Sequence, residues 1–284
     1  MFLIGFGVGI GVIVIALANI GESVFLILQL NEIFLILGLS FSYIVIIGWD
    51  FLTKIRTDIQ AYILGKNILS YDEVKETILA TFALLKKMRI KGLMSIEADL
   101  EVLHESLILR DFKTLEKNIV IQQFIQNIFN ILLIDTNIKG DELKAQIDKT
   151  IKRIEADQMK TSHILANLAD ALPAMGILAA LIGIMHVMHH YINDTPEVIG
   201  ELMAVAMSGT FVGVWLSYSI LQPLAGKMAL NAEEHTALFT AITSCVILYL
   251  DNKEPIVAVQ YARTQLPINI PLNTLESLLR QIKV

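Results

Sequence analysis

Four long runs of apolar residues that contain no Lys, Arg, Asp or Glu divide this chain. They cover residues 1–21, 33–49, 171–193 and 202–226. A helix needs about 20 apolar residues to cross the hydrocarbon core of a bilayer, and each run comes close to that length. The pattern therefore predicts an all-α membrane protein with four transmembrane helices and a large helical cytoplasmic domain between spans 2 and 3.

The basic residues predict how the spans are oriented. All 22 Lys and Arg residues lie in two stretches, 51–160 and 227–284. Basic residues concentrate on the cytoplasmic side of membrane proteins. The connections at 22–32 and 194–201 carry only acidic charges, as expected outside. Both termini and the long region between spans 2 and 3 are therefore expected in the cytoplasm of a multi-pass protein.

This topology divides the chain into four segments. Residues 1–50 hold transmembrane helices 1 and 2, and residues 51–168 form a cytoplasmic helical domain without proline. Residues 169–226 hold transmembrane helices 3 and 4. Residues 227–284 form a cytoplasmic helix and a tail, in which Pro255, Pro267 and Pro271 are followed by a short helix near 273–282. Within the cytoplasmic domain, helical periodicity predicts helices over about 71–89, from about 95, over 112–133 and from about 141 into span 3.

Small residues and prolines mark spans 3 and 4. Gly176, Ala179, Ala180 and Gly183 form a stripe at helical spacing, and Gly209 and Gly213 lie four residues apart. Small side chains let membrane helices approach closely. Pro173 and Pro223 lie at the predicted cytoplasmic ends of these spans, where a proline either only marks a helix end or forms a hinge.

Composition and motifs exclude several classes of function. None of the common nucleotide-binding, hydrolase or metalloprotease signatures is present, so the chain is not expected to be an enzyme or to carry a cofactor. The net charge of −6 argues against a nucleic-acid partner. Cys245 is the only cysteine, which excludes an intramolecular disulfide. No metal site is expected.

Histidines and carboxylates are the polar groups of the membrane part. His186, His189 and His190 lie toward the outer end of span 3, where an interfacial position is favoured over metal binding. The nearby carboxylates fall at the predicted edges of the spans and are expected to reach water: Glu32, Asp50, Asp170 and Glu201. If the chain moves ions, a partner should therefore supply the titrating carboxylate.

Several segments together resemble the MotA flagellar stator family, over nearly the whole chain. The resemblance is carried by LPAMGILAALIGIMH at 172–186, MAVAMSGTFVG at 203–213, QPLA at 222–225, RIKGLMSIE at 89–97 and PIVAVQYAR at 255–263. The chain departs from the family pattern in the basic residues between Lys149 and Arg153 and in Gln260, where Glu is common. These departures affect electrostatic detail.

The resemblance implies a motor component of the bacterial inner membrane. MotA subunits form a pentameric ring around two helices of MotB, a single-span, peptidoglycan-binding subunit that supplies the ion-binding aspartate. Ion flow, here expected to be of protons, becomes torque on the rotor protein FliG, which drives flagellar rotation in motility and chemotaxis. By position, Arg89 and Glu97 would contact the rotor, while Pro173, Thr210 and Pro223 would belong to the ion path and its coupling.

Two other readings remain open. One is an energising subunit similar to ExbB or TolQ, whose three-span arrangement differs from the four spans predicted here. The other is a solute or metal transporter that uses the histidine cluster and works without a partner. For Arg89 and Glu97, the residues alone would favour an ordinary solvated pair on a helix surface.

Overall fold

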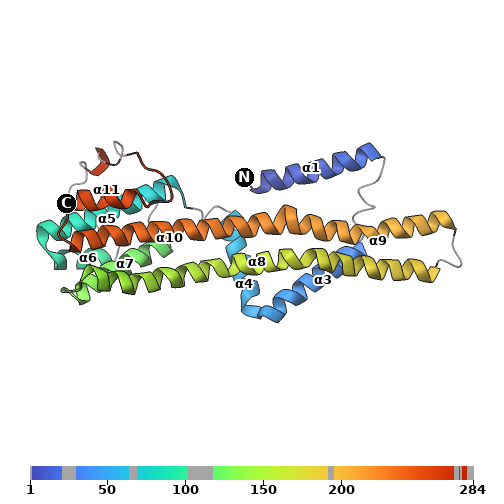
Figure 1. Ribbon diagram of the computed structural model, residues 1–284, viewed down its shortest axis with the longest axis horizontal. Coiled ribbons are helices and arrows are strands. Elements are labelled where there is room, and N and C mark those ends of the chain that lie inside the picture. The colour runs from blue at the N-terminus through green and yellow to red at the C-terminus, as the bar shows by residue number, and fades with distance from the viewer. Residues whose placement is uncertain are drawn as a thin grey trace. The chain divides into compact units, whose positions relative to one another are not determined.

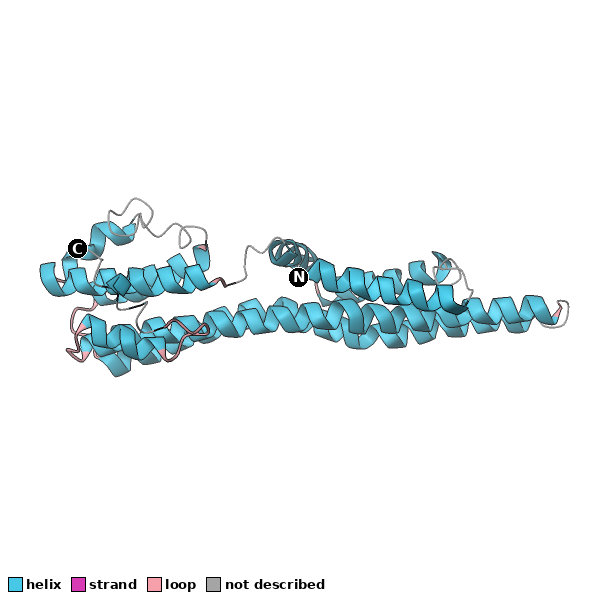
Figure 2. Cartoon of the chain, turned by 90° about the horizontal axis from the view of Figure 1, so that it is seen from above, coloured by secondary structure: helices cyan, strands magenta, loops and turns pink. Residues whose placement is uncertain are grey.

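The computed structural model describes residues 2–20, 30–63, 69–101, 118–190, 195–271, 275 and 277–279, and every regular element in these ranges is helical (Figure 2). The all-α prediction is confirmed. The chain forms two compact units. Unit 1 comprises Met1–Lys66 and Gln158–Ala229, and unit 2 comprises Asn67–Asp157 and Leu230–Val284.

Unit 1 contains the most apolar helices. They are α1 (Phe2–Ile20), α3 (Leu30–Ile47), α4 (Trp49–Ile63), the second part of α8 (Gly140–His190), α9 (Pro196–Leu216) and the first turns of α10 (Gln222–Leu250), all labelled in Figure 1. The π-helical turn η3 (Ser217–Leu221) lies between α9 and α10. Gly48 ends α3 with φ of 148°, a backbone angle that residues with a side chain rarely adopt.

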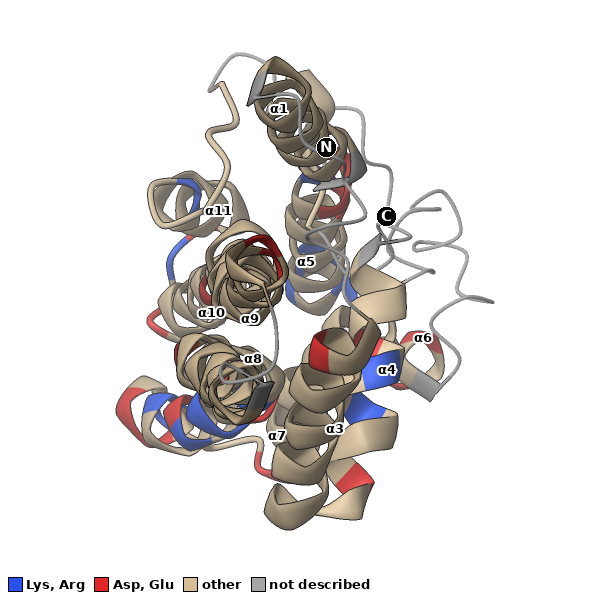
Figure 3. Ribbon diagram, turned by 90° about the vertical axis from the view of Figure 1, so that its right-hand side faces the viewer, with Lys and Arg blue, Asp and Glu red and all other residues tan. Residues whose placement is uncertain are grey.

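Three helical runs among the described residues are long and apolar enough to cross a membrane: Leu30–Ile47, a segment within Gly140–His189, and a segment within Pro196–Leu250. Helix α1 is also apolar, but its apolar segment, Ile4–Asn19, is shorter than these three. In Figure 3 α1 carries no Lys, Arg, Asp or Glu, whereas α4 shows the basic residues that follow span 2.

Helices α8 and α9 lie side by side in unit 1 and meet through small residues (Figure 1). A Cβ added to Gly176 would lie 2.6 Å from the carbonyl oxygen of Gly209, and one added to Gly213 would lie 2.7 Å from that of Leu172. A Cβ added to Gly183 would lie 2.7 Å from the Cβ of Ala206. The predicted packing role of the small-residue stripe is confirmed, because only glycine fits at these contacts.

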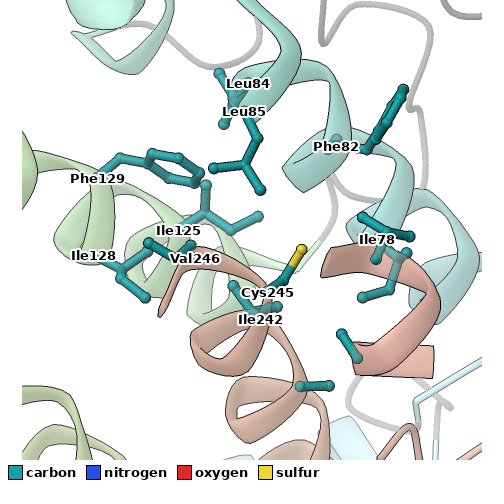
Figure 4. Close-up of a cluster of buried hydrophobic side chains, with 14 of the residues drawn as sticks. Ile78, Phe82, Leu84, Leu85, Ile125, Ile128, Phe129, Ile242, Cys245 and Val246 are labelled. Atoms are coloured by element: carbon teal, nitrogen blue, oxygen red, sulfur yellow. The ribbon is translucent and has the colours of Figure 1, made fainter. Parts of the chain in front are cut away.

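Unit 2 encloses the larger hydrophobic core. It is built from α5 (Tyr71–Lys91), the short 3-10 helix η1 (Leu93–Ile96), α6 (Glu97–Glu101), α7 (Ile119–Ile134), the start of α8, the end of α10 and α11 (Pro255–Arg263). Figure 4 shows part of this core, where Leu85, Phe129 and Cys245 point toward one another from three different helices. Burial of such side chains is the main favourable term in folding.

Local signals set most helix boundaries in unit 2. The amide of Glu73 donates to the Ser70 hydroxyl oxygen at 3.2 Å, and the amide of Ser70 donates to the Glu73 carboxylate at 2.8 Å. This reciprocal pair starts α5. The Asn118 side chain caps α7, so the helix expected from 112 begins at Ile119 within the described residues. Residues 102–117 lie outside them.

Two expectations for the helices of unit 2 need correction. The helix expected from about 95 is a 3-10 turn followed by α6 from Glu97, because Gly92 has φ of 88° and redirects the chain. The segment after Pro255, expected as an irregular tail, begins with α11, whose Ala258, Val259 and Ala262 are fully buried. The short helix expected at 273–282 lies largely outside the described residues.

Candidate functional site

The seam between α8 and α9 contains two of the residues predicted to couple ion passage to movement, Pro173 and Thr210, and the third, Pro223, lies beyond the end of α9 in α10. Pro173 lies inside α8 and is half-buried. Proline has no backbone N–H, so the carbonyl of Ala169, four residues earlier, loses its helical donor. The Ser217 hydroxyl donates a hydrogen bond of 2.6 Å to this carbonyl oxygen. A side chain from the neighbouring helix therefore replaces the bond that Pro173 cannot make.

The second proline follows an irregular turn. The π turn η3 (Ser217–Leu221) joins α9 to α10, and Pro223 is the second residue of α10. Turns of this kind occur mostly as single insertions at functional sites. The Gln222 side-chain amide donates to the Asp170 carboxylate at 3.1 Å, so the segments that carry the two prolines are linked by two hydrogen bonds.

Thr210 lies at the closest approach of the two helices. Its Cα would be 3.1 Å from a Cβ on Gly176, and its side chain is half-buried. The structure therefore brings Thr210 into the same seam that contains Pro173 and Gly176. Its hydroxyl offers a neutral donor and acceptor, but no titratable proton.

Glu32 is the residue that the sequence analysis missed. It was expected to reach water at the outer edge of span 2, and this expectation is wrong. Glu32 is only 7% exposed, and the hydroxyl of Ser208 donates to its Oε2 at 2.5 Å. Its Oε1 has no hydrogen-bond partner among the described residues. Asp50, Asp170 and Glu201 are exposed, as expected.

The carboxyl group of Glu32 occupies a space left by two glycines. A Cβ on Gly209 would lie 2.9 Å from its Oε2, and one on Gly183 would lie 3.5 Å from its Oε1. The sequence held a signal for this burial, because residues 24–28 before Glu32 are all apolar. Because the predicted span 2 began after Glu32, at residue 33, this residue was expected at the edge of the span, in contact with water.

The predicted rotor-contact residues lie in unit 2, at one corner of the α5–α6 hairpin. Arg89 is in the last turn of α5 and Glu97 is the first residue of α6, and both side chains are exposed. An ion pair between Lys87 and Asp99 joins the two helices. The half-buried Lys87 and the buried Asp99 thus hold the corner next to the predicted contact residues.

Arg89 also makes contacts within unit 2. Its guanidinium donates to the carbonyl oxygen of Lys253 at 3.2 Å, just before α11. Burial raises the pKa of Tyr249, and the nearby positive charge of Arg89 opposes part of this rise. A shallow depression beside Arg89 is lined by residues of α5 and of the start of α11: Phe82, Lys86, Ile90, Glu254, Pro255 and Ile256.

The histidines do not form a metal centre with other ligands in the described part of the chain. The side chains of His186 and His189 on α8 are exposed. No group of three or more His, Cys, Asp or Glu residues in the described ranges is placed to hold a metal ion. The side chain of His190 lies outside the described residues.

Comparison with known proteins gives consistent matches over both units. The sequence model of the MotA/TolQ/ExbB proton channel family matches residues 116–241. Motility protein A of Salmonella typhimurium is 31% identical over 185 residues, which are 65% of this chain and 62% of that protein. The chain thus aligns to less than two thirds of the length of that relative.

Two solved structures have the same fold. The Campylobacter jejuni MotAB structure matches with a TM-score of 0.76 at 15% identity, covering 95% of this chain and 96% of that one. The flagellar MotAB stator complex of Bacillus subtilis matches with a TM-score of 0.74 at 18% identity, covering 93% and 95%. At these identities the structural likeness shows the fold alone.

Proposed function

We propose that this chain, which is similar to MotA proteins in sequence and in fold, is a flagellar stator subunit. In this proposal it forms an ion channel with a MotB-like partner and converts ion flow, expected to be of protons, into torque on the rotor. The observation that carries the proposal is the α8–α9 seam, in which glycines allow close helix contact and Pro173 interrupts the hydrogen bonding of α8.

The proposed arrangement places four spans in the bacterial inner membrane. Residues 1–50 would hold spans 1 and 2, and residues 169–226 would hold spans 3 and 4. Residues 51–168 and 227–284 would be cytoplasmic, together with both termini. The absence of Lys and Arg from residues 1–50 and 161–226 supports this arrangement.

The proposed assembly is a ring of five copies around two helices of a single-span, peptidoglycan-binding partner. Exposed apolar side chains on the spans supply surface for such contacts and for lipid: Phe34, Leu37, Ile177, Leu181, Met207 and Phe211. A partner that contributes a carboxylate next to Thr210 would complete an ion path, because Thr210 itself carries no charge.

The proposed rotor contact uses Arg89 and Glu97, and the rotor protein would be FliG. Both side chains are exposed where the Lys87–Asp99 ion pair joins α5 to α6. The charges of Arg89 and Glu97 would therefore be held on a fixed backbone. Movement would reach this corner through the helices that carry Pro173 and Pro223, since prolines lower the cost of bending a helix.

The first test is co-purification with a candidate MotB-like subunit from the same cell, followed by cryo-EM and a motility assay. We expect a ring around two partner helices and restored swimming in a strain that lacks its own stator subunit. A ring that forms with a partner of an energising system and leaves swimming unchanged would favour the ExbB/TolQ-like function. Transport by the chain without any partner would favour a transporter.

A further inference from the structure

Helix α4 follows α3 directly and has one side that unit 1 covers. Ile55 is buried against residues of α8 and α10, and Phe51 and Ile59 pack around it. The hydroxyl of Thr161 on α8 donates to the carboxylate of Asp58 at 2.5 Å. The apolar face of α4 and one of its two acidic groups are therefore satisfied within unit 1.

The opposite side of α4 carries a stripe of exposed side chains. Four exposed residues follow one another at spacings that place them on one helix face: Trp49, Thr53, Arg56 and Gln60. Trp49 is 61% exposed. An exposed tryptophan that shares a helix face with an arginine is typical of a helix at a membrane surface, where the ring meets the acyl chains and the charge meets the headgroups.

The ring of Trp49 continues the exposed apolar surface of α3. It meets the ring of Phe41 edge-on, at 90° and with the ring centroids 6.4 Å apart. Phe41 is 52% exposed and Ile46 is 82% exposed. Exposed apolar side chains of a membrane span face lipid, and tryptophan is enriched where the hydrocarbon ends. In the proposed membrane arrangement, Trp49 therefore lies at this boundary, and Arg56 lies farther along the same face on the headgroup side.

The charge on this side of unit 1 is mainly basic. Within the described part of unit 1, each Lys and Arg lies within about three turns of the predicted cytoplasmic end of a span: Lys54, Arg56, Lys160 and Lys227. Figure 3 shows the basic residues of α4 in blue. Asp50 is exposed beside Trp49 and opposes part of the attraction. Each Lys or Arg near the surface strengthens binding to an anionic membrane by about fivefold.

We propose that the exposed face of α4 is a binding site for an anionic phospholipid, with Trp49 against its acyl chains and Arg56 on its headgroup phosphate. Arginine suits this role because its guanidinium can donate two parallel hydrogen bonds to a phosphate. The occupant is a lipid, because the face joins the exposed apolar surface of α3 through Phe41 and its arginine complements a negative headgroup. This inference rests on the proposed membrane arrangement of the chain and is independent of torque.

Fluorescence quenching by brominated lipids tests the proposal. The chain has two tryptophans, Trp49 and Trp215, so Trp215→Phe leaves Trp49 as the only one. The full chain is placed in vesicles of equal parts phosphatidylglycerol and phosphatidylcholine, with bromine on the acyl chains of one lipid or the other. We expect stronger quenching when phosphatidylglycerol carries the bromine. Arg56→Gln should reduce this preference about fivefold.

A matched control removes the same charge elsewhere. Lys144→Gln, which neutralises an exposed residue of unit 2, should keep the preference. Arg56→Lys, which keeps the charge but not the paired donors, should keep part of it. If Trp215→Phe fails to fold, native mass spectrometry of the chain with both of its tryptophans replaces the quenching. Delipidated protein mixed with the two lipids should then retain more phosphatidylglycerol, and Arg56→Gln should lose that excess.

Three results would overturn the proposal. Equal quenching by the two lipids would leave α4 at the membrane but remove the preference for anionic lipid. An unchanged preference in Arg56→Gln would remove the role of the guanidinium. Quenching by neither lipid would show that protein or water, and not lipid, lies against Trp49. Swimming and co-purification with the partner test the stator function separately, so a failure there leaves these lipid measurements unaffected.

Discussion

The Ser217 hydroxyl lies 2.6 Å from the carbonyl oxygen of Ala169, the acceptor that Pro173 leaves without its helical donor. A break in one helix is thus repaired by a side chain of the next. A hydrogen bond from a side chain of another helix constrains the backbone less than the regular backbone bond within a helix does. With the Ser217 bond in place, α8 can bend without leaving the buried Ala169 carbonyl unpaired. This pair explains how a proline is tolerated deep inside a long helix.

Replacing Ser217 with Ala should destabilise unit 1. The Ala169 carbonyl would then be buried without a donor, at a cost of about 1–2 kcal/mol. Thermal unfolding of the purified chain should show a lower Tm. Ser219→Ala, an exposed serine of the same π turn, is the control and should leave Tm unchanged. Equal Tm values for both variants would show that the bond contributes nothing measurable.

Replacing Pro173 with Ala should block rotation while the complex still assembles. The new N–H at position 173 can donate to the Ala169 carbonyl, which would make α8 a regular helix and remove its bending point. Swimming assays and co-purification with the partner measure the two effects separately. A variant that no longer assembles would instead make Pro173 a structural residue.

Replacing Gly176 with Ala should separate α8 from α9. The nearest neighbours of the new Cβ would be the Gly209 carbonyl oxygen at 2.6 Å and the Thr210 Cα at 3.1 Å. Because both are backbone atoms, the helices themselves must move. Overpacking of this kind costs about 1–3 kcal/mol. Gly200→Ala on α9 meets no atom within 4 Å and should be neutral. Matching Tm values and motility for the two variants would contradict the close contact.

Reversing the charges of Arg89 and Glu97 together should impair torque and leave membrane insertion intact. Both side chains are exposed, and the reversal removes one exposed hydrogen bond, from Arg89 to the Lys253 carbonyl, so the double variant is expected to fold. Torque is measured from the rotation of tethered cells, and insertion from the membrane fraction. Lys144→Glu, an exposed reversal on α8, is the control. Normal torque in the double variant would remove the rotor-contact claim.

The Cys245 thiol should react slowly while the chain is folded. Burial raises the pKa of Cys245, and a higher pKa lowers the fraction of reactive thiolate at any given pH. Iodoacetamide at about pH 8, near the ordinary thiol pKa, should label it only after denaturation, as followed by mass spectrometry. An added exposed thiol, Ala98→Cys, should label at once. Fast labelling of folded Cys245 would contradict the packing in Figure 4.

Periodicity predicted the long elements well and the short ones poorly. The helix expected from about 141 into span 3 is α8, which begins at Gly140. The break at Gly92 agrees with the gap expected between the helices over about 71–89 and from about 95. The 3-10 helix η1 and the helix α11 were not predicted correctly, since a segment of a few residues has too little periodicity to indicate a helix. Helix α11 forms because Ala258, Val259 and Ala262 fit into the core of unit 2.

The candidate residues also differ in how much of their role could be predicted from local sequence. Pro173 and Gly176 could be singled out from sequence, because the chemistry of proline and glycine is local. The partners of these residues could not, since Ser217 is 48 positions from Ala169 along the chain. Glu32 was misjudged for the same reason, because its environment is made by α8 and α9 and not by its neighbours in sequence.

The sequence by itself determined the helical class, the apolar segments and the uneven distribution of basic residues, because these depend on composition and on periodicity within one segment. Only the tertiary structure decided which polar groups are buried and which atoms satisfy them. Hydrogen bonds such as Ser208 to Glu32 join residues 176 positions apart. Their formation depends on how closely three helices approach, and that distance is set by side-chain volume at contacts that no single segment contains.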